Sequence, residues 1–135
     1  MALLPPAAEP LGPQDLQRYA SAPLDDIDYE VFYEVVLQLG AEGTRALLGT
    51  LGEDGQARLD RLSAAASASD WAAVGKEAHA LKSGAGTFGL RGVSARALAL
   101  EMACRAGVGW EQLGAVEGLS GALAQGVDAL RGRLG

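Results

Sequence analysis

All five prolines of this chain lie within its first 23 residues, and every later position is free of proline. Proline removes a backbone hydrogen-bond donor and clashes with the preceding helical turn, so the proline-free remainder is able to form long helices. The early prolines instead predict an arm over residues 1–25, with at most one short helix near Gln14 to Ala20. The 135-residue length suits a single domain, which we place at residues 26–135.

Apolar residues after the arm recur at spacings of three and four, the period of a helix with one buried face. The first such segment covers about residues 29–38; aspartates precede it, and Gly40 is expected to end it. Its predicted buried side carries Phe32, Val35, Val36 and Leu39. The second segment covers about residues 42–68, and three glycines weaken its middle and allow a kink there: Gly49, Gly52 and Gly55.

Three more helices are predicted beyond these segments. The third covers about residues 71–88 with Asp70 as its N-cap, the fourth about residues 90–107, and the fifth about residues 110–134. No segment shows the alternation of a strand. Because short turns join the helices, we predict an all-α fold: an up-down four-helix bundle of the last four, with an additional short N-terminal helix packed at one end.

Charge and hydropathy argue against several classes of function. A formal net charge of −6 and an isoelectric point near 4.7 are unfavourable for binding the phosphate backbone of a nucleic acid. No apolar run approaches the roughly 20 residues that cross a bilayer, and the leading MALLPPAAEP lacks the basic start of a secretion signal. We therefore expect no nucleic-acid partner, no membrane association and a cytoplasmic location.

The single cysteine, Cys104, permits no internal disulfide and no cysteine-rich metal site. It lies on the apolar stripe of the fourth predicted helix, which indicates a core thiol rather than a reactive one. Trp71 and Phe88 are spaced as core anchors of the third helix. One histidine and one cysteine without clustered carboxylates do not make a ligand set, so no metal site is expected.

Positive charge is concentrated in one part of this acidic chain. Residues 71–106 carry five Lys or Arg and two Glu, a net charge of +3, so the remainder carries −9. Such a stretch suits a negatively charged partner or ligand. A helical surface stabilised by salt bridges would have the same composition, and charge alone favours that simpler interpretation.

His79 is the only histidine, and Lys76 and Lys82, three residues to either side of it, are the only lysines. Helical geometry turns His79 away from the apolar stripe and puts small residues on its side: Gly75, Ser83 and Gly86. A neutral imidazole is nucleophilic near neutral pH, and adjacent ammonium groups would stabilise a phosphoryl group attached to it. Alternatively, His79 is an ordinary surface residue and the glycines that follow only end the helix.

A longer pattern surrounds this histidine. Residues 78–90 read AHALKSGAGTFGL: a histidine, a lysine three residues later, small residues four to seven later, and a glycine ten later. An Ala-Ser-Asp-Trp turn precedes the helix, and Leu100-Glu101 lies in the next one. The pattern resembles the signature of histidine-containing phosphotransfer (HPt) domains, including the phosphotransfer domain of chemotaxis histidine kinases, and the likeness covers about residues 28–134.

The resemblance implies roles for three side chains. His79 would accept a phosphoryl group on Nε2, and Lys82 would stabilise the phosphate. Glu101 would accept a hydrogen bond from Nδ1–H, which fixes the orientation of the imidazole and leaves Nε2 free. A salt bridge between Glu101 and Arg105, four residues later, is an alternative that is compatible with this role.

Small and charged residues around the histidine are the predicted docking positions for a partner: Gly75, Lys76, Ser83, Gly86 and Gly89. Ser83 stands where glycine is commonest in the family and slightly narrows that surface. Lys76 either widens the positive field for an acidic partner or is simply solvated beside Glu77, and the sequence favours neither interpretation.

The predicted function is that of an intermediate in a two-component phosphorelay. His79 would receive a phosphoryl group from a receiver-domain aspartyl phosphate or a histidine kinase and pass it to a response-regulator aspartate. The chain would be a monomeric carrier rather than an enzyme and would need no cofactor of its own, with Mg²⁺ supplied by the partner receiver. The alternative is an HPt-like adaptor or inhibitor that docks a kinase or regulator without carrying phosphate.

Overall fold

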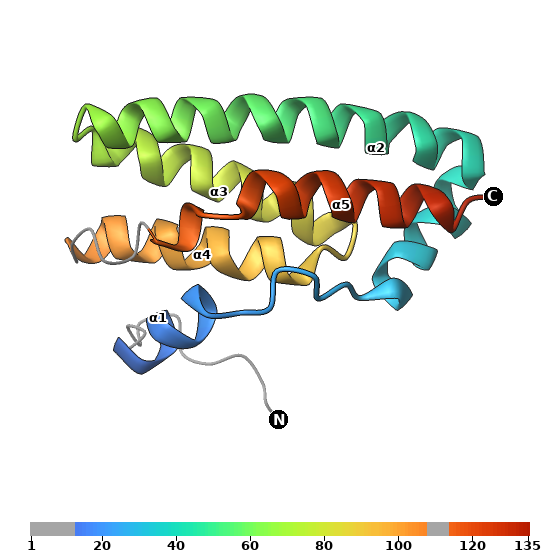
Figure 1. Cartoon of the computed structure of the whole chain (residues 1–135). Coiled ribbons are helices and arrows are strands. Elements are labelled where there is room, and N and C mark those ends of the chain that lie inside the picture. Colours follow the sequence, from blue (N-terminus) through green and yellow to red (C-terminus); the bar gives the residue numbers. More distant parts are fainter. Residues whose placement is uncertain (1–12, 108–113) are drawn as a thin grey trace.

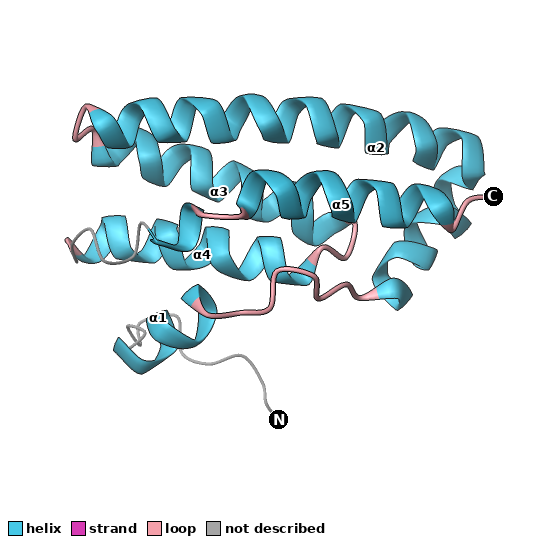
Figure 2. Ribbon diagram, viewed as in Figure 1, coloured by secondary structure: helices cyan, strands magenta, loops and turns pink. Residues whose placement is uncertain are grey.

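The computed structural model describes residues 13–107 and 114–135, and five α-helices account for most of them. The helices are α1 Pro13–Ala20, α2 Tyr29–Ser67, α3 Trp71–Thr87, α4 Arg91–Ala106 and α5 Leu119–Gly132 (Figure 1). Within the described ranges no strand is present (Figure 2). The prediction of an all-helical fold is confirmed, and α1 is the short helix expected near residues 14–20.

The four longer helices lie side by side, and each runs opposite to the one before it (Figure 1). Helix α3 packs against both α2 and α4, α5 lies along α2, and α1 contacts α4. The core between them consists mainly of leucine, valine and alanine, and its largest fully buried side chain is Phe32. Close packing of these small side chains places α3, which carries His79, between two neighbours.

Aspartate caps begin two of the helices. The Asp28 carboxylate accepts hydrogen bonds from the backbone N–H groups of Glu30 and Val31, and Asp70 accepts one from Ala73 at 3.2 Å. Each satisfies backbone donors that the first helical turn leaves without a partner. The predicted N-cap role of Asp70 is therefore confirmed, and it sets the start of α3 at Trp71, eight residues before His79.

Helix α2 bends at Gly40, where the sequence predicts a helix end. Gly40 has φ 76° and ψ 165°, a conformation that residues with a Cβ rarely adopt. The fully buried Thr44 donates its hydroxyl hydrogen to the Gly40 carbonyl at 2.7 Å, which supports the chain just after the bend. The part before Gly40 crosses the end of the bundle (Figure 1). The predicted short helix over about residues 29–38 is this first part of α2.

The kink allowed for in the middle of α2 is not observed, because the helix is continuous through Gly49, Gly52 and Gly55. Gly55 is buried, and a Cβ at this position would collide with the Leu123 side chain of α5. At Gly52 a Cβ would make ordinary contact with Val127, also on α5. Gly55 therefore lets α5 approach α2 closely, and none of the three glycines bends the helix.

The predicted start of the last helix is wrong. Helix α5 begins at Leu119 rather than near residue 110, because Gly118 adopts a left-handed conformation with φ 83° that interrupts the helix. Residues 114–116 form a short 3₁₀ turn before it. The expectation that Trp110 packs at the start of this helix lies outside the described residues.

A segment that we call the N-terminal strap, residues 22–28, is fastened to the turn between α3 and α4. The Asp28 N–H donates to the Gly89 carbonyl at 2.7 Å, and the Gly92 N–H donates to the Asp26 carbonyl at 3.0 Å. Arg91 adds a two-point ion pair to the Asp26 carboxylate at 2.8 and 3.0 Å. The strap therefore holds the end of α3 next to the start of α4.

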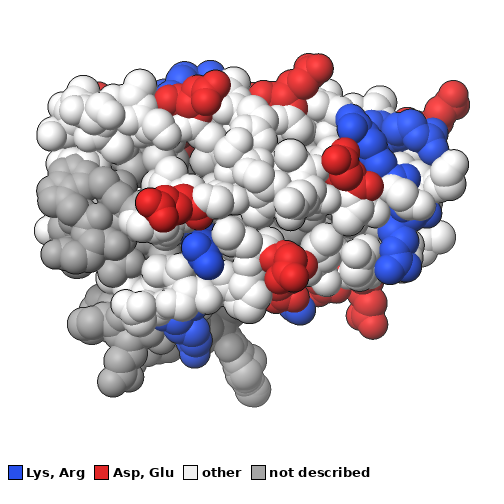
Figure 3. All heavy atoms as spheres, viewed as in Figure 1, with Lys and Arg blue, Asp and Glu red and all other residues white. Residues whose placement is uncertain are grey.

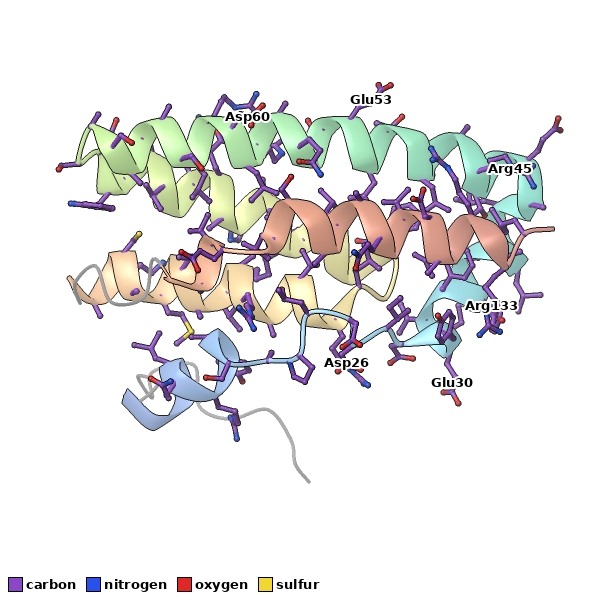
Figure 4. The ribbon with its side chains drawn as sticks, in the orientation of Figure 1. Asp26, Glu30, Arg45, Glu53, Asp60 and Arg133 are labelled. Atoms are coloured by element: carbon purple, nitrogen blue, oxygen red, sulfur yellow. The ribbon has the colours of Figure 1, made fainter. Side chains whose placement is uncertain are left out.

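Contacts of two arginines hold the C-terminal end of the chain against α2. Figure 3 shows basic side chains gathered at one end of the bundle, where Figure 4 places Arg45 and Arg133. Arg133 lies 4.3 Å from the Tyr29 ring centre and donates to the Tyr33 hydroxyl at 3.1 Å. Arg45 donates to the Leu134 carbonyl at 3.4 Å. These contacts fix the end of α5 against the bend in α2.

Candidate functional site

His79 projects from the exposed side of α3, as its position in the sequence predicts. Its side chain is 57% exposed, whereas the buried stripe of the helix consists of Val74, Ala78, Leu81 and Ala85. Lys82 follows one turn later with a side chain that is 27% exposed. A partner molecule can therefore reach the imidazole without opening the bundle.

A buried carboxylate on the neighbouring helix holds this histidine. The Glu101 side chain is only 5% exposed, and its Oε2 accepts a hydrogen bond from His79 Nδ1 at 2.7 Å. Lys82 Nζ donates to Oε1 at 2.9 Å, and Arg105 donates to Oε2, also at 2.9 Å. The structure thus contains both contacts that the sequence offers for Glu101, one to the imidazole and one to Arg105.

The environment of Glu101 keeps its carboxyl group ionised. Burial alone would raise the pKa of Glu101, but the hydrogen bonds from Lys82 and His79, together with the positive charge of Lys82, outweigh burial and lower it. An ionised carboxylate can only accept, so the hydrogen in the 2.7 Å contact belongs to His79 Nδ1. In the neutral form of the imidazole, the free lone pair is therefore on Nε2.

Lys82 is close to the ring without bonding to it. Its Nζ lies 3.4 Å from His79 Nδ1, but in this tautomer both nitrogens are donors. The ammonium group is instead held by Glu101. This arrangement keeps a positive charge beside the imidazole without consuming its lone pair.

The lowered pKa of Glu101 predicts a specific dependence of stability on pH. Its ionised form stabilises the fold fully above the usual value of about 4.5, and this contribution is lost as the pH falls through the lower folded-state pKa. We expect the loss of unfolding free energy between about pH 6 and about pH 3 to be smaller in Glu101→Gln than in the wild type. Urea denaturation of both proteins at each pH measures this loss. Equal losses in the variant and the wild type would contradict the stabilising role of ionised Glu101.

An open groove runs beside His79 between α3 and α4. Its walls include side chains from both helices: Trp71, Gly75, Lys76, His79, Cys104 and Arg105. Lys76 is exposed and the Arg105 side chain is 75% exposed, so this rim is positively charged. Two of the five basic residues in the stretch 71–106, Lys76 and Arg105, therefore line the groove beside His79.

Cys104 and Trp71 are less deeply buried than the sequence indicates. Both pack against the core but remain partly exposed and line this groove. Burial still raises the pKa of the Cys104 thiol, which favours the unreactive protonated form. Phe88, the other predicted anchor, is buried at 7% exposure.

The predicted docking positions differ in their surroundings. Lys76 and Ser83 are exposed, whereas Gly75 and Gly86 are half-buried. A Cβ at Gly75 would lie 3.5 Å from Cys104 Cβ, and one at Gly86 would lie 3.2 Å from Ser94 Oγ. The contact at Gly86 would be tight, so this glycine lets α4 approach α3, whereas the contact at Gly75 would be ordinary.

Gly89 is the exception among those positions because it is buried. Its φ is 85°, and a Cβ there would collide with the carbonyl oxygen of Asp28 in the N-terminal strap. The close approach of the strap therefore explains why this position is glycine. The contact of Gly89 in this structure is with the chain's own backbone.

Exposed leucines lie on the other side of α3, and sequence reasoning missed them. A groove there is lined by Leu39 and Leu47 from α2 and by Thr87 from α3. Leu39 is 47% exposed and Leu47 is 44% exposed, although Leu39 is predicted to be buried. A usable signal is the Leu47-Leu48 pair: Leu48 lies on the apolar stripe of its helix and is fully buried, whereas Leu47 points about 100° away from it, towards the edge of that stripe.

The described part of the chain contains neither a metal-binding cluster nor a helix that could span a membrane. Among residues 13–107 and 114–135, no three His, Cys, Asp or Glu side chains are grouped so that they could hold a metal ion. None of the helices described combines the length and the apolar character needed to cross a bilayer.

The fold and the site together define a class: a helical bundle that displays one histidine, held by a buried carboxylate and flanked by a lysine. The Hpt domain family matches residues 46–133, and the chain belongs to this family. Its members are phosphoryl carriers that work with the kinases and receiver domains of two-component systems. A histidine phosphotransfer role in a phosphorelay follows from this membership.

A solved structure shows the same fold. Histidine-containing phosphotransfer protein B (HptB) from Pseudomonas aeruginosa PAO1 is 24% identical in sequence and superimposes with a TM-score of 0.74. The match covers 84% of this chain and 96% of that protein. No curated protein sequence matches the chain.

Proposed function

We propose that His79 accepts a phosphoryl group on Nε2 from a receiver-domain aspartyl phosphate or a kinase and passes it to the aspartate of a response regulator. The single observation that carries this proposal is the 2.7 Å hydrogen bond from Nδ1 to Glu101. It orients the ring and leaves the nucleophilic lone pair on the nitrogen that is not engaged with the protein.

The transfer step conserves atoms and charge. The Nε2 lone pair of His79 attacks phosphorus, the bond from phosphorus to the aspartyl oxygen breaks, and the aspartate leaves with that electron pair. Nδ1 keeps its proton, so the phosphorylated ring carries a positive charge next to Glu101. Lys82 supplies the positive charge for the phosphoryl oxygens, while Mg²⁺ belongs to the receiver. The reverse step returns the group to a second aspartate.

Charged and apolar side chains on either side of His79 suit a receiver domain as partner. Lys76 and Arg105 offer positive charge towards the acidic site that holds the partner's aspartate. Leu39 and Leu47 offer exposed apolar surface on the opposite side of α3. Ser83 and Gly86, about one and two turns after His79 on α3, present little bulk.

A panel of phosphorylated receiver domains tests the proposal. We expect transfer of acid-labile, alkali-stable label to the wild-type protein and none to His79→Gln, while both proteins show the same helical circular dichroism. Arg131→Gln, which removes a cation from an exposed pair with Asp128 on α5 and leaves the acceptor in place, is the matched control and should be labelled like the wild type.

Two other results would overturn the carrier function. Label that persists on His79→Gln would place the acceptor elsewhere. Receiver binding without any transfer, unchanged in His79→Gln, would identify the chain as an adaptor that docks its partner without phosphate.

A further inference from the structure

Lys82, the cation that we assign to the phosphoryl group, already forms an ion pair with Glu101 before phosphorylation. Lys82 Nζ donates to Glu101 Oε1 at 2.9 Å, and this carboxylate is almost fully buried. A buried carboxylate that loses its cations is strongly destabilised, because neither water nor protein then compensates its charge. Lys82 can therefore turn to a phosphoryl group only if another cation stays with Glu101.

Arg105 is placed to be that cation. It donates to Glu101 Oε2 at 2.9 Å, the same oxygen that accepts from the His79 ring. Arg105 and Glu101 are four residues apart on α4, so the helix itself keeps the pair together. Their contact does not depend on the position of α3.

Unlike Arg105, Lys82 lies on a different helix from Glu101. It shares α3 with His79 and lies one turn from it, and its Nζ is 3.4 Å from the ring nitrogen Nδ1. The Lys82 carbonyl accepts a hydrogen bond from the Ser94 hydroxyl at 3.0 Å, which holds the backbone while the side chain can reorient. A small rotation of this side chain, rather than a movement of a helix, would carry the ammonium group from carboxylate to phosphate.

We infer that Arg105 is a positioning residue that holds Glu101 while Lys82 moves from this carboxylate to the phosphoryl group on His79. Before transfer, Glu101 is neutralised by Lys82 and Arg105 next to a neutral ring. After transfer, it is neutralised by Arg105 and the positively charged phosphorylated ring. Two cations contact Glu101 in both states, so Lys82 leaves without exposing a buried negative charge. This inference rests on the proposed function of His79.

Arg105→Gln tests the inference in transfer kinetics. We expect transfer from a phosphorylated receiver to His79 to slow about fivefold, since Lys82 is then the last cation on Glu101 in the unphosphorylated protein. Arg105→Lys should restore most of the rate. Arg131→Gln is the matched control, because it removes an arginine from an exposed pair with Asp128 on α5 and should transfer at the wild-type rate.

Nitrogen-15 NMR spectra of the lysine and arginine side chains supply a second readout. It would not change if Arg105 had a purely structural role. On phosphorylation of the wild type we expect the Lys82 ammonium signal to shift and the Arg105 guanidinium signal to stay. The inference would be overturned if the Arg105 signal shifted instead of the Lys82 signal, or if Arg105→Gln accepted the phosphoryl group at the wild-type rate. Either result would leave the acceptor role of His79 intact. Absence of any label on wild-type His79 would overturn both.

Discussion

Replacement of Gly92 by alanine is expected to lower the free energy of unfolding by about 3 kcal/mol. A Cβ at this position would collide with the backbone carbonyl groups of Pro23 and Leu24, and backbone atoms cannot rotate away as a side chain can. The displaced strap would also lose the hydrogen bond from the Gly92 N–H to the Asp26 carbonyl. Urea denaturation followed by circular dichroism measures the change.

Gly121→Ala is the matched control for this prediction. Gly121 lies in α5, and no atom comes within 4 Å of a Cβ built there. Alanine has the higher helix propensity, so this variant should gain up to about 1 kcal/mol of stability. If Gly92→Ala were as stable as Gly121→Ala, the close contact between the N-terminal strap and α4 would not exist in solution.

The second large effect is expected from Glu101→Ala, which should slow phosphoryl transfer to His79 by about 100-fold. The substitution removes the acceptor of the Nδ1 hydrogen bond, so the ring loses its fixed orientation and tautomer. It also frees Lys82 and Arg105, which both donate to this carboxylate. Rates of transfer from a phosphorylated receiver measure the loss.

Glu101→Gln separates the hydrogen bond from the charge. A glutamine oxygen can still accept from His79 Nδ1, so orientation is retained while the negative charge is lost. We expect a loss of about tenfold or less, clearly smaller than in Glu101→Ala. Equal rates for the alanine variant and the wild type would show that the buried carboxylate does not orient the histidine for transfer.

Local signals in the sequence account for most of the helices and for the exposed histidine. Apolar spacing indicates the helices, Asp70 indicates the start of α3, and Gly40, predicted as a helix end, marks the position where α2 bends. The orientation of His79 follows from the period of a single helix. Such features depend on residues within a few turns of each other, which a sequence displays directly.

Features that depend on contacts between distant segments were not predictable in this way. The strap explains why Gly92 is glycine, yet residues far apart in the chain make that contact. The wrong start of α5 has a local cause, since Gly118 interrupts a spacing that otherwise looks helical. For Glu101 the family resemblance predicts the partner of the histidine, but only the packing of α3 on α4 reveals that Lys82 and Arg105 share the same carboxylate.

Nitrogen-15 spectroscopy of the histidine ring after phosphorylation by a receiver domain tests the central claim most directly. The account predicts that phosphorus is bonded to Nε2 of His79 and that Nδ1 keeps its proton and its hydrogen bond to Glu101. Phosphorus on Nδ1, or a labelled protein whose His79 ring is unmodified, would contradict it.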